Sequence, residues 1–167
     1  MYLESERLLI RDVKISDAPF YFDLFNDKDW IENISDKGLR TINETASYLE
    51  EMVDKNGKTS GLGFFTVIQK ETQKAIGVAT ALQRENLNFV DVGYGFLPVG
   101  RGNGYATEAT KLMLDYIRTT FKQEKVVAFT KPKNKRSQKL LLSLNFAYVG
   151  KQVIFDDDED DVFELIF

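Results

Sequence analysis

The chain opens with a pattern that changes from strand-like to helix-like. An apolar run within Arg7–Val13 predicts a β-strand. The polar pair Ser16-Asp17 precedes apolar residues at helical spacing in residues 20–25, so one of the pair is expected to cap a helix there. After a polar stretch, Thr41 and Glu44 have the spacing of a capping box. They predict the start of a second helix.

Three strand-like runs occupy the middle of the chain. They cover Phe64–Gln69, Ala75–Gln83 and Asn88–Leu97, and the polar residues 71–74 separate the first two as a hairpin turn. Because short connections join strands that are neighbours in a sheet, these runs predict an antiparallel meander.

The remaining chain alternates between helix and strand patterns. A glycine-rich turn at Gly100–Gly104 precedes apolar residues at helical spacing from Tyr105 to Ile117, which form the clearest helix pattern in the sequence. The order of elements predicts a mixed α/β (α+β) fold, in which helices flank a mostly antiparallel central sheet with one strand–helix–strand crossover. The other expected elements are a strand at Val126–Thr130, a helix at Ser137–Leu144, and strands at Tyr148–Phe155 and Val162–Phe167 around an acidic turn at residues 156–161.

Composition narrows the possible functions. The 167 residues suit one domain, expected over residues 1–167. The sequence has no cysteine and no histidine, which excludes disulfides, a cysteine nucleophile and the commonest general base, and no metal site is expected. The net charge of −4 argues against a nucleic-acid partner. Without a signal-peptide pattern or an apolar run of membrane-spanning length, we expect a soluble, cytoplasmic protein with no membrane partner.

The glycine loop Gly100–Gly104 lies between a predicted strand and the clearest predicted helix. Backbone N–H groups at a helix start lack partners within the helix, and glycines let a phosphate approach them closely, so this arrangement predicts an anion site. The loop lacks the Gly-Lys-Ser/Thr of a Walker motif, and its glycines do not fit the dinucleotide frame. The pattern Arg/Gln-x-x-Gly-x-Gly/Ala does fit, as Arg101-Gly102-Asn103-Gly104-Tyr105-Ala106.

This hexapeptide resembles the cofactor loop of the GNAT superfamily of acetyl-CoA-dependent N-acetyltransferases, in particular the branch that acetylates ribosomal-protein N-termini. The resemblance covers nearly the whole chain, including Glu6–Arg11, Ser16–Ala18, Gly93–Pro98 and Asn134–Ser137. One departure is Asn145, where the family usually has glycine, but asparagine tolerates the left-handed conformation expected at a helix end. The resemblance implies the GNAT fold, acetyl-CoA as co-substrate and direct attack of a primary amine on the thioester.

The resemblance also implies how the cofactor is held. Backbone amides of residues 102–106 are expected to bind the pyrophosphate, and Thr107 to add a hydroxyl contact. The strand end at Phe96 and Leu97 is expected to pair with the pantetheine arm, and N–H groups near Phe96 to polarise the thioester carbonyl. Asn134 matches an asparagine that contacts the arm. The full expected cofactor set is Phe96, Leu97, Arg101, Gly102, Asn103, Gly104, Tyr105, Ala106, Thr107 and Asn134.

Two residues are the catalytic candidates, Ser137 and Asp91. By resemblance, Ser137 matches a serine proposed to protonate the leaving thiolate, although a helix serine with a satisfied hydroxyl fits the same pattern. Without histidine, the acceptor's proton must pass to a carboxylate or to water. Asp91, on the strand leading to the loop, is the candidate carboxylate, whereas Glu108 more simply complements the helix dipole. Tyr94 faces away from Asp91 in a regular strand, and the β-bulge usual in the family would change this.

Each of two charged segments has two possible roles. The cations Lys131, Lys133, Lys135 and Arg136 either attract the 3′-phosphate of the cofactor or form an ordinary solvated run. The acidic run at residues 156–161 is either a solvated turn or a docking surface for a cationic acceptor.

The function itself keeps alternatives as well. The leading hypothesis is an N-acetyltransferase whose acceptor is either a protein or peptide N-terminus or a small-molecule amine. A catalytically silent module that binds or senses acetyl-CoA is the alternative from another class, and a nucleotide-binding protein that uses the same glycine loop is a third. By resemblance, a homodimer is a further expectation.

Overall fold

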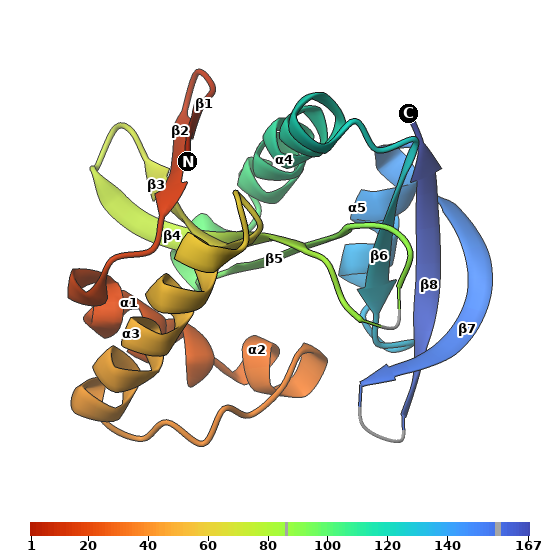
Figure 1. Ribbon diagram of the computed structural model, residues 1–167. Coiled ribbons are helices and arrows are strands. Elements are labelled where there is room, and N and C mark those ends of the chain that lie inside the picture. Colours follow the sequence, from red (N-terminus) through yellow and green to blue (C-terminus); the bar gives the residue numbers. More distant parts are fainter. Residues whose placement is uncertain (86, 156–157) are drawn as a thin grey trace.

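The computed structural model describes residues 1–85, 87–155 and 158–167. Its strands form one 8-stranded sheet in the order β1-β2-β3-β4-β5-β6-β8-β7 (Figure 1). Neighbouring strands are antiparallel except β5 and β6, which are parallel. The strands are Tyr2–Glu4 (β1), Leu8–Asp12 (β2), Gly63–Gln69 (β3), Lys74–Leu82 (β4), Asp91–Phe96 (β5), Lys125–Thr130 (β6), Ala147–Phe155 (β7) and Asp158–Ile166 (β8).

Helices cover both faces of this sheet (Figure 1). One face carries α1, α2 and α3, whose aromatic and aliphatic residues, including Phe25, Trp30 and Leu49, form one buried cluster. The other face carries α4 and α5, which contribute Met113, Ile117 and other residues to a larger cluster. The helices are Ala18–Phe25 (α1), Lys28–Asn33 (α2), Ile42–Lys58 (α3), Tyr105–Phe121 (α4) and Lys135–Ser143 (α5), and short 3-10 turns span Ile15–Asp17 (η1) and Pro98–Gly100 (η2).

The predicted architecture is confirmed. β3, β4 and β5 form the expected antiparallel meander, and α4 makes the crossover between parallel β5 and β6. The capping box is present: the Glu44 amide donates to Thr41 Oγ1 at 3.1 Å, and the Thr41 amide donates to Glu44 Oε2 at 3.0 Å. Asn145 adopts the expected left-handed conformation after α5, with φ of 67°. It therefore serves where glycine is usual.

The acidic run was predicted wrongly in part. Residues 156 and 157 lie outside the described residues, but Asp158–Asp161 belong to β8 rather than to a turn. Lys131 forms ion pairs with Asp158 and Asp160, and Gln138 donates a hydrogen bond to Asp161. These partners offset the mutual repulsion that led us to expect a solvated turn.

Two short elements were not predicted. β1 has three residues and α2 has six, too few for a clear periodic pattern. α2 depends on tertiary contacts: Asp27 caps it by accepting a hydrogen bond from the Trp30 amide, and the Trp30 ring covers Gly95 of β5. A Cβ on Gly95 would lie 2.5 Å from the indole, so this packing requires glycine.

Asp17 precedes α1 as expected, but its side chain makes no capping hydrogen bond to that helix. Instead it accepts two hydrogen bonds from Arg11, at 2.7 and 2.8 Å, and one each from the Lys14 amide and Thr66 Oγ1. Burial alone would raise the pKa of Asp17, but the hydrogen bonds from Arg11 and Lys14 outweigh it and lower that pKa. Asp17 thus ties β2, η1 and β3 together.

Replacing Asp17 is expected to destabilise the fold in a pH-dependent way. Asp17→Asn should lower the free energy of unfolding by about 2 kcal/mol at neutral pH, because Arg11 loses its charged partner in a largely buried place. A carboxylate whose pKa is lowered by folding contributes stability above its usual pKa and loses it as the pH falls through the lowered value. The difference between the two chains should therefore shrink in acid. Urea unfolding across this range measures it, with exposed Asp23→Asn of α1 as control, and a constant difference would refute the explanation.

Candidate active site

β5 and β6 separate after a single pairing. β5 pairs with β4 along its whole length, without a register shift, but with β6 only through Asp91 and Val127. The Leu97 amide donates to the Ile76 carbonyl of β4 at 3.0 Å. Because backbone groups alternate in direction along a strand, those of Tyr94 and Phe96 point away from β4, toward the opening beside β6. This strand edge can accept an extended chain.

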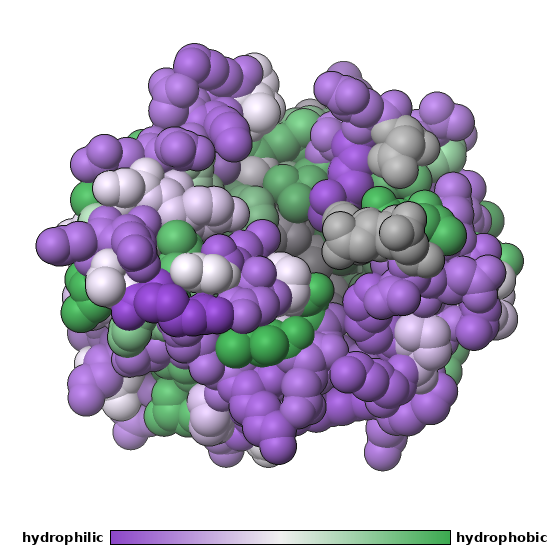
Figure 2. Space-filling view, turned by 90° about the horizontal axis from the view of Figure 1, so that it is seen from below, coloured by the Kyte–Doolittle hydropathy of each residue, from purple (hydrophilic) through white to green (hydrophobic). Residues whose placement is uncertain are grey.

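The opening lies at the lower edge of the sheet in Figure 1, with α2 on one side and the ends of β6 and β8 on the other. Figure 2 views the molecule from this side and shows a surface that is hollowed near its centre, with both hydrophobic and hydrophilic residues bordering the hollow. The gap between the strands therefore coincides with a depression in the surface.

The glycine loop meets α4 beside the end of β5. Gly102 and Gly104 have φ angles of 78° and 79°, a left-handed conformation that favours glycine. Gly104 is the N-cap residue of α4, and because it has no side chain it cannot satisfy the first N–H groups of the helix. The loop is exposed from Gly102 to Gly104. A helix start of this kind attracts an anion.

Arg7 contacts the glycine loop from the segment before β2, a role that no sequence pattern predicted. Its Nη1 donates to the Asn103 carbonyl at 3.0 Å, and its guanidinium lies 4.6 Å from the centre of the Tyr105 ring. Glu108 in the first turn of α4 accepts hydrogen bonds from Arg7 Nε at 2.7 Å and from Ser5 Oγ at 2.6 Å. Glu108 therefore links α4 to the segment before β2, besides lying where it complements the helix dipole.

The Arg101 side chain is directed toward α2. It forms ion pairs with Asp27 and Asp29, and its Nε donates to the Phe96 carbonyl at 2.9 Å. Asp29 also accepts a hydrogen bond from Arg136 at 2.7 Å, which is the main cause that lowers its pKa. Asp29 thus joins the glycine loop to the start of α5, while the Phe96 carbonyl already has a partner.

Ser137 and Tyr94 meet across the opening. Asn134 caps α5 by accepting a hydrogen bond from the Ser137 amide at 3.1 Å, which fixes the first turn. The hydroxyl oxygens of Tyr94 and Ser137 lie 2.8 Å apart. Burial raises the pKa of Tyr94 to about 12, so its hydroxyl stays protonated near neutrality. Tyr94 had no predicted role, because its contact with Ser137 depends on how β5 and α5 are placed.

Asp91 lies apart from this pair. Its carboxylate is buried in an ion pair with Arg84, and burial raises its pKa. Because β5 has no bulge in its pairing with β4, Asp91 and Tyr94 point to opposite faces of the sheet. The family bulge that we considered at this point is absent from β5. The role of Asp91 stays a prediction, as do those of Ser137 and the cofactor set.

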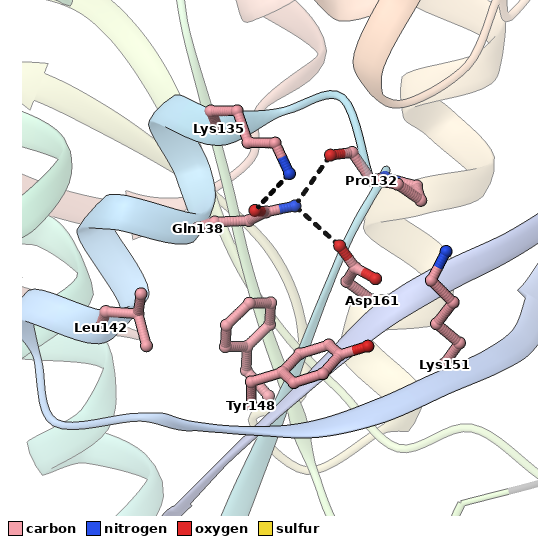
Figure 3. Close-up of a pocket in the computed structure, with 8 residues that line it drawn as sticks. Pro132, Lys135, Gln138, Leu142, Tyr148, Lys151 and Asp161 are labelled. Atoms are coloured by element: carbon pink, nitrogen blue, oxygen red, sulfur yellow. Dashed lines mark hydrogen bonds between the residues drawn. The ribbon is translucent and has the colours of Figure 1, made fainter.

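The face that carries α5 has a second hollow (Figure 3). This cavity of about 410 Å³ lies between α5 and the β7–β8 pair, and Lys135 and Lys151 contribute to its wall. Gln138 donates to the Pro132 carbonyl at 3.1 Å and to Asp161 at 2.8 Å, which closes one side. Lys135, one of the four basic residues considered for the cofactor phosphate, therefore lines this cavity.

Two further features bear on the chemistry. Within the described ranges, no group of His, Cys, Asp or Glu side chains is arranged to hold a metal ion. Across the same ranges, no helix has the length and apolar character needed to span a membrane.

Solved structures share this architecture. The ribosomal-protein-S5-alanine acetyltransferase from Vibrio fischeri superposes with a TM-score of 0.80 at 20% sequence identity, covering 99% of this chain and 96% of that one. RimL, a ribosomal-protein alpha-N-acetyltransferase in complex with coenzyme A, superposes with a TM-score of 0.85 at 14% identity, covering 99% and 98%. At these identities the likeness shows the fold.

Sequence comparison shows the family. An uncharacterized N-acetyltransferase named p20 from Bacillus licheniformis is 26% identical over 150 residues, covering 89% of this chain and 83% of that protein. The family described as Acetyltransferase (GNAT) domain matches residues 7–147. The chain therefore belongs to the GNAT acetyltransferase family and is an acetyl-CoA-dependent acyltransferase.

Proposed function

We propose that this protein, acting as one domain over residues 1–167, transfers the acetyl group of acetyl-CoA to a primary amine. The acceptor is a protein or peptide N-terminus or a small-molecule amine. The observation that carries the proposal is the opening between β5 and β6, where an unpaired strand edge, an uncapped helix start and the Tyr94–Ser137 pair converge. These are the parts needed to hold a thioester and to protonate its leaving group.

The donor is held by the backbone in this proposal. N–H groups of residues 102–106 bind the pyrophosphate at the start of α4, with Thr107 adding a hydroxyl contact. The edge at Tyr94 and Phe96 pairs with the pantetheine arm. The Leu97 amide is engaged by Ile76 and the Phe96 carbonyl by Arg101. The N–H of Phe96, which points away from β4 toward the opening, is therefore the better donor to the thioester oxygen. Arg101 then acts by holding α2 against the loop, and Asn134 by orienting Ser137.

The reaction follows from this arrangement. The neutral amine nitrogen attacks the thioester carbon and forms the N–C bond, and the C–S bond then breaks. The departing thiolate takes a proton from Ser137, which Tyr94 resupplies through the hydrogen bond between their hydroxyls. The proton released by the amine passes to a carboxylate or to water, and Tyr94 regains its proton from solvent.

An acetylation assay tests this function. The full chain is mixed with acetyl-CoA and a panel of peptides with free N-termini, polyamines and small amines, and the free thiol and the acetylated product are measured. We expect thiol release that depends on the added amine, with a matching mass increase in one class of acceptor. No turnover together with a melting temperature raised by acetyl-CoA would favour a binding or sensing module. Tighter binding of ATP than of coenzyme A would favour the nucleotide-binding alternative.

A further inference from the structure

Asp160 is a buried carboxylate with an oxygen that lacks a partner. The residue is only 2% exposed, at the start of β8. Its Oδ1 lies 3.4 Å from Lys131 Nζ, but Oδ2 has no hydrogen-bond partner among the described residues, although it is fully buried. Burying an acceptor without a donor costs free energy, and native structures rarely keep one without a reason. A donor supplied by a bound molecule is such a reason.

The sheet register places Asp160 next to the opening. Thr130 of β6 pairs with Asp161 of β8, so Lys131 and Asp160 are the next neighbours along this ladder. Counted from the pairing of Asp91 with Val127, Lys131 lies level with Gly95 on the far side of the gap. Asp160 therefore lies one strand beyond the edge of the opening, near the separated ends of β5 and β6.

Asp160 also lies on a different face from the proton donor. The Asp161 side chain bonds Gln138 of α5, so it points to the face that carries α4 and α5. Side chains alternate along a strand, so Asp160 points to the opposite face, the one covered by α1, α2 and α3. Ser137 and Asp160 thus approach the gap from the two sides of the sheet. An acceptor that enters opposite the leaving thiolate comes from the face on which Asp160 lies.

We propose that Asp160 receives the ammonium group of the acceptor and takes one of its protons. This inference rests on the proposed acetyl transfer and names the acceptor as a cationic primary amine. One ammonium proton passes to Asp160, and the neutral nitrogen attacks the thioester carbon. A second proton leaves the nitrogen for water as the amide forms, and the third stays on the amide. The thiolate gains its proton through Ser137 and Tyr94, and water then returns one proton to that pair. Asp160 returns its proton to solvent after the product leaves.

The charges around Asp160 fit this role. Burial raises its pKa above the usual value, and Lys131 opposes that rise. Among the described residues, Asp158 and Asp161 also act on Asp160, and their negative charges raise its pKa further. Asp91, the candidate from the sequence, is instead paired with Arg84. A carboxylate with a free oxygen is the better receiver for an ammonium.

The test compares Asp160→Asn with Asp158→Asn in the full chain. Asp158 is a matched control because it is in the same strand, also pairs with Lys131 and is 83% exposed. With an amine that is charged at the assay pH, we expect Asp160→Asn to lower kcat/KM about 100-fold and Asp158→Asn to change it less than about threefold. With a weakly basic amine that is already neutral, the loss in Asp160→Asn should fall to about threefold or less.

The outcomes separate this inference from the proposed function. If the native chain acetylates no amine, both are overturned. If the native chain acetylates amines but Asp160→Asn matches Asp158→Asn, or loses the same factor with charged and neutral amines, only the inference fails. The melting temperature, measured with and without coenzyme A, reports whether each variant folds and binds the donor. If Asp160→Asn does not fold, Asp160→Ser, which has a smaller uncharged side chain, takes its place in the same comparison.

Discussion

Gly104→Ala is expected to weaken coenzyme A binding about tenfold or more. Gly104 has a φ of 79°, and an L-residue in this conformation costs about 1–2 kcal/mol, which corresponds to about tenfold in affinity. The loop is exposed, so an alanine there can relax to another conformation in the free chain. Binding must then restore the geometry that aims the N–H groups at the pyrophosphate. The cost of the substitution therefore appears in the dissociation constant.

Gly38→Ala is the control for this prediction. Gly38 has a φ of 70°, and nothing lies within 4 Å of the Cβ that alanine would add. Gly38→Ala has the same free-energy cost of placing an L-residue at positive φ, at a site remote from the loop in sequence. Isothermal titration with coenzyme A should show affinity unchanged in Gly38→Ala and reduced in Gly104→Ala. Equal affinities in both variants would mean that the loop does not hold the pyrophosphate.

The parts of the fold that the sequence predicted are those set by local interactions. α4 follows from one apolar face over 17 residues, and the start of α3 from the reciprocal hydrogen bonds of Thr41 and Glu44. The loop itself was recognisable because its glycines occupy positions where a positive φ is required. Each of these signals lies within a few residues of the feature that it specifies.

The parts that were missed depend on partners far away in the chain. α2 has only six residues and is held by Arg101 and Arg136 through Asp27 and Asp29. The strand at Asp158–Asp161 exists because Lys131 and Gln138 reach it from β6 and α5. No periodic pattern encodes such contacts, since their strength depends on where the sheet brings distant residues.

In the candidate site, too, features set by local sequence were predicted and features set by distant contacts were missed. The glycine loop and Ser137 were identified from the sequence, the serine through a family resemblance, while the contact between Ser137 and Tyr94 required the placement of α5 against β5. Asp91 was selected because it lies on the strand that leads to the loop. The structure places it on the opposite face from Tyr94 and in an ion pair with Arg84. The alternation of side chains along β5 could be predicted from the sequence, but the ion pair between Asp91 and Arg84 could not.

Ser137→Ala is expected to lower kcat about 100-fold while leaving coenzyme A affinity nearly unchanged. A serine with a purely structural role in a helix usually bonds its hydroxyl to a carbonyl one turn earlier. Ser143 does this, with its Oγ 2.7 Å from the Leu140 carbonyl, and Ser143→Ala in the same helix is the matched control. Ser137 instead shares a hydrogen bond with Tyr94, whose raised pKa keeps a proton available.

The substitution Tyr94→Phe distinguishes the roles of the Tyr94 and Ser137 hydroxyls in proton transfer. If Ser137 gives its proton to the thiolate and Tyr94 resupplies it, Tyr94→Phe should lower kcat by about tenfold, less than Ser137→Ala, because water can replace the second donor but not the first. Combining both substitutions should add little to the loss in Ser137→Ala, since residues that act in one proton chain are not additive. Steady-state kinetics with acetyl-CoA and a saturating amine give the four values needed. If Ser137→Ala keeps the native kcat, solvent protonates the thiolate. If Tyr94→Phe lowers kcat more than Ser137→Ala does, Tyr94 is the direct donor.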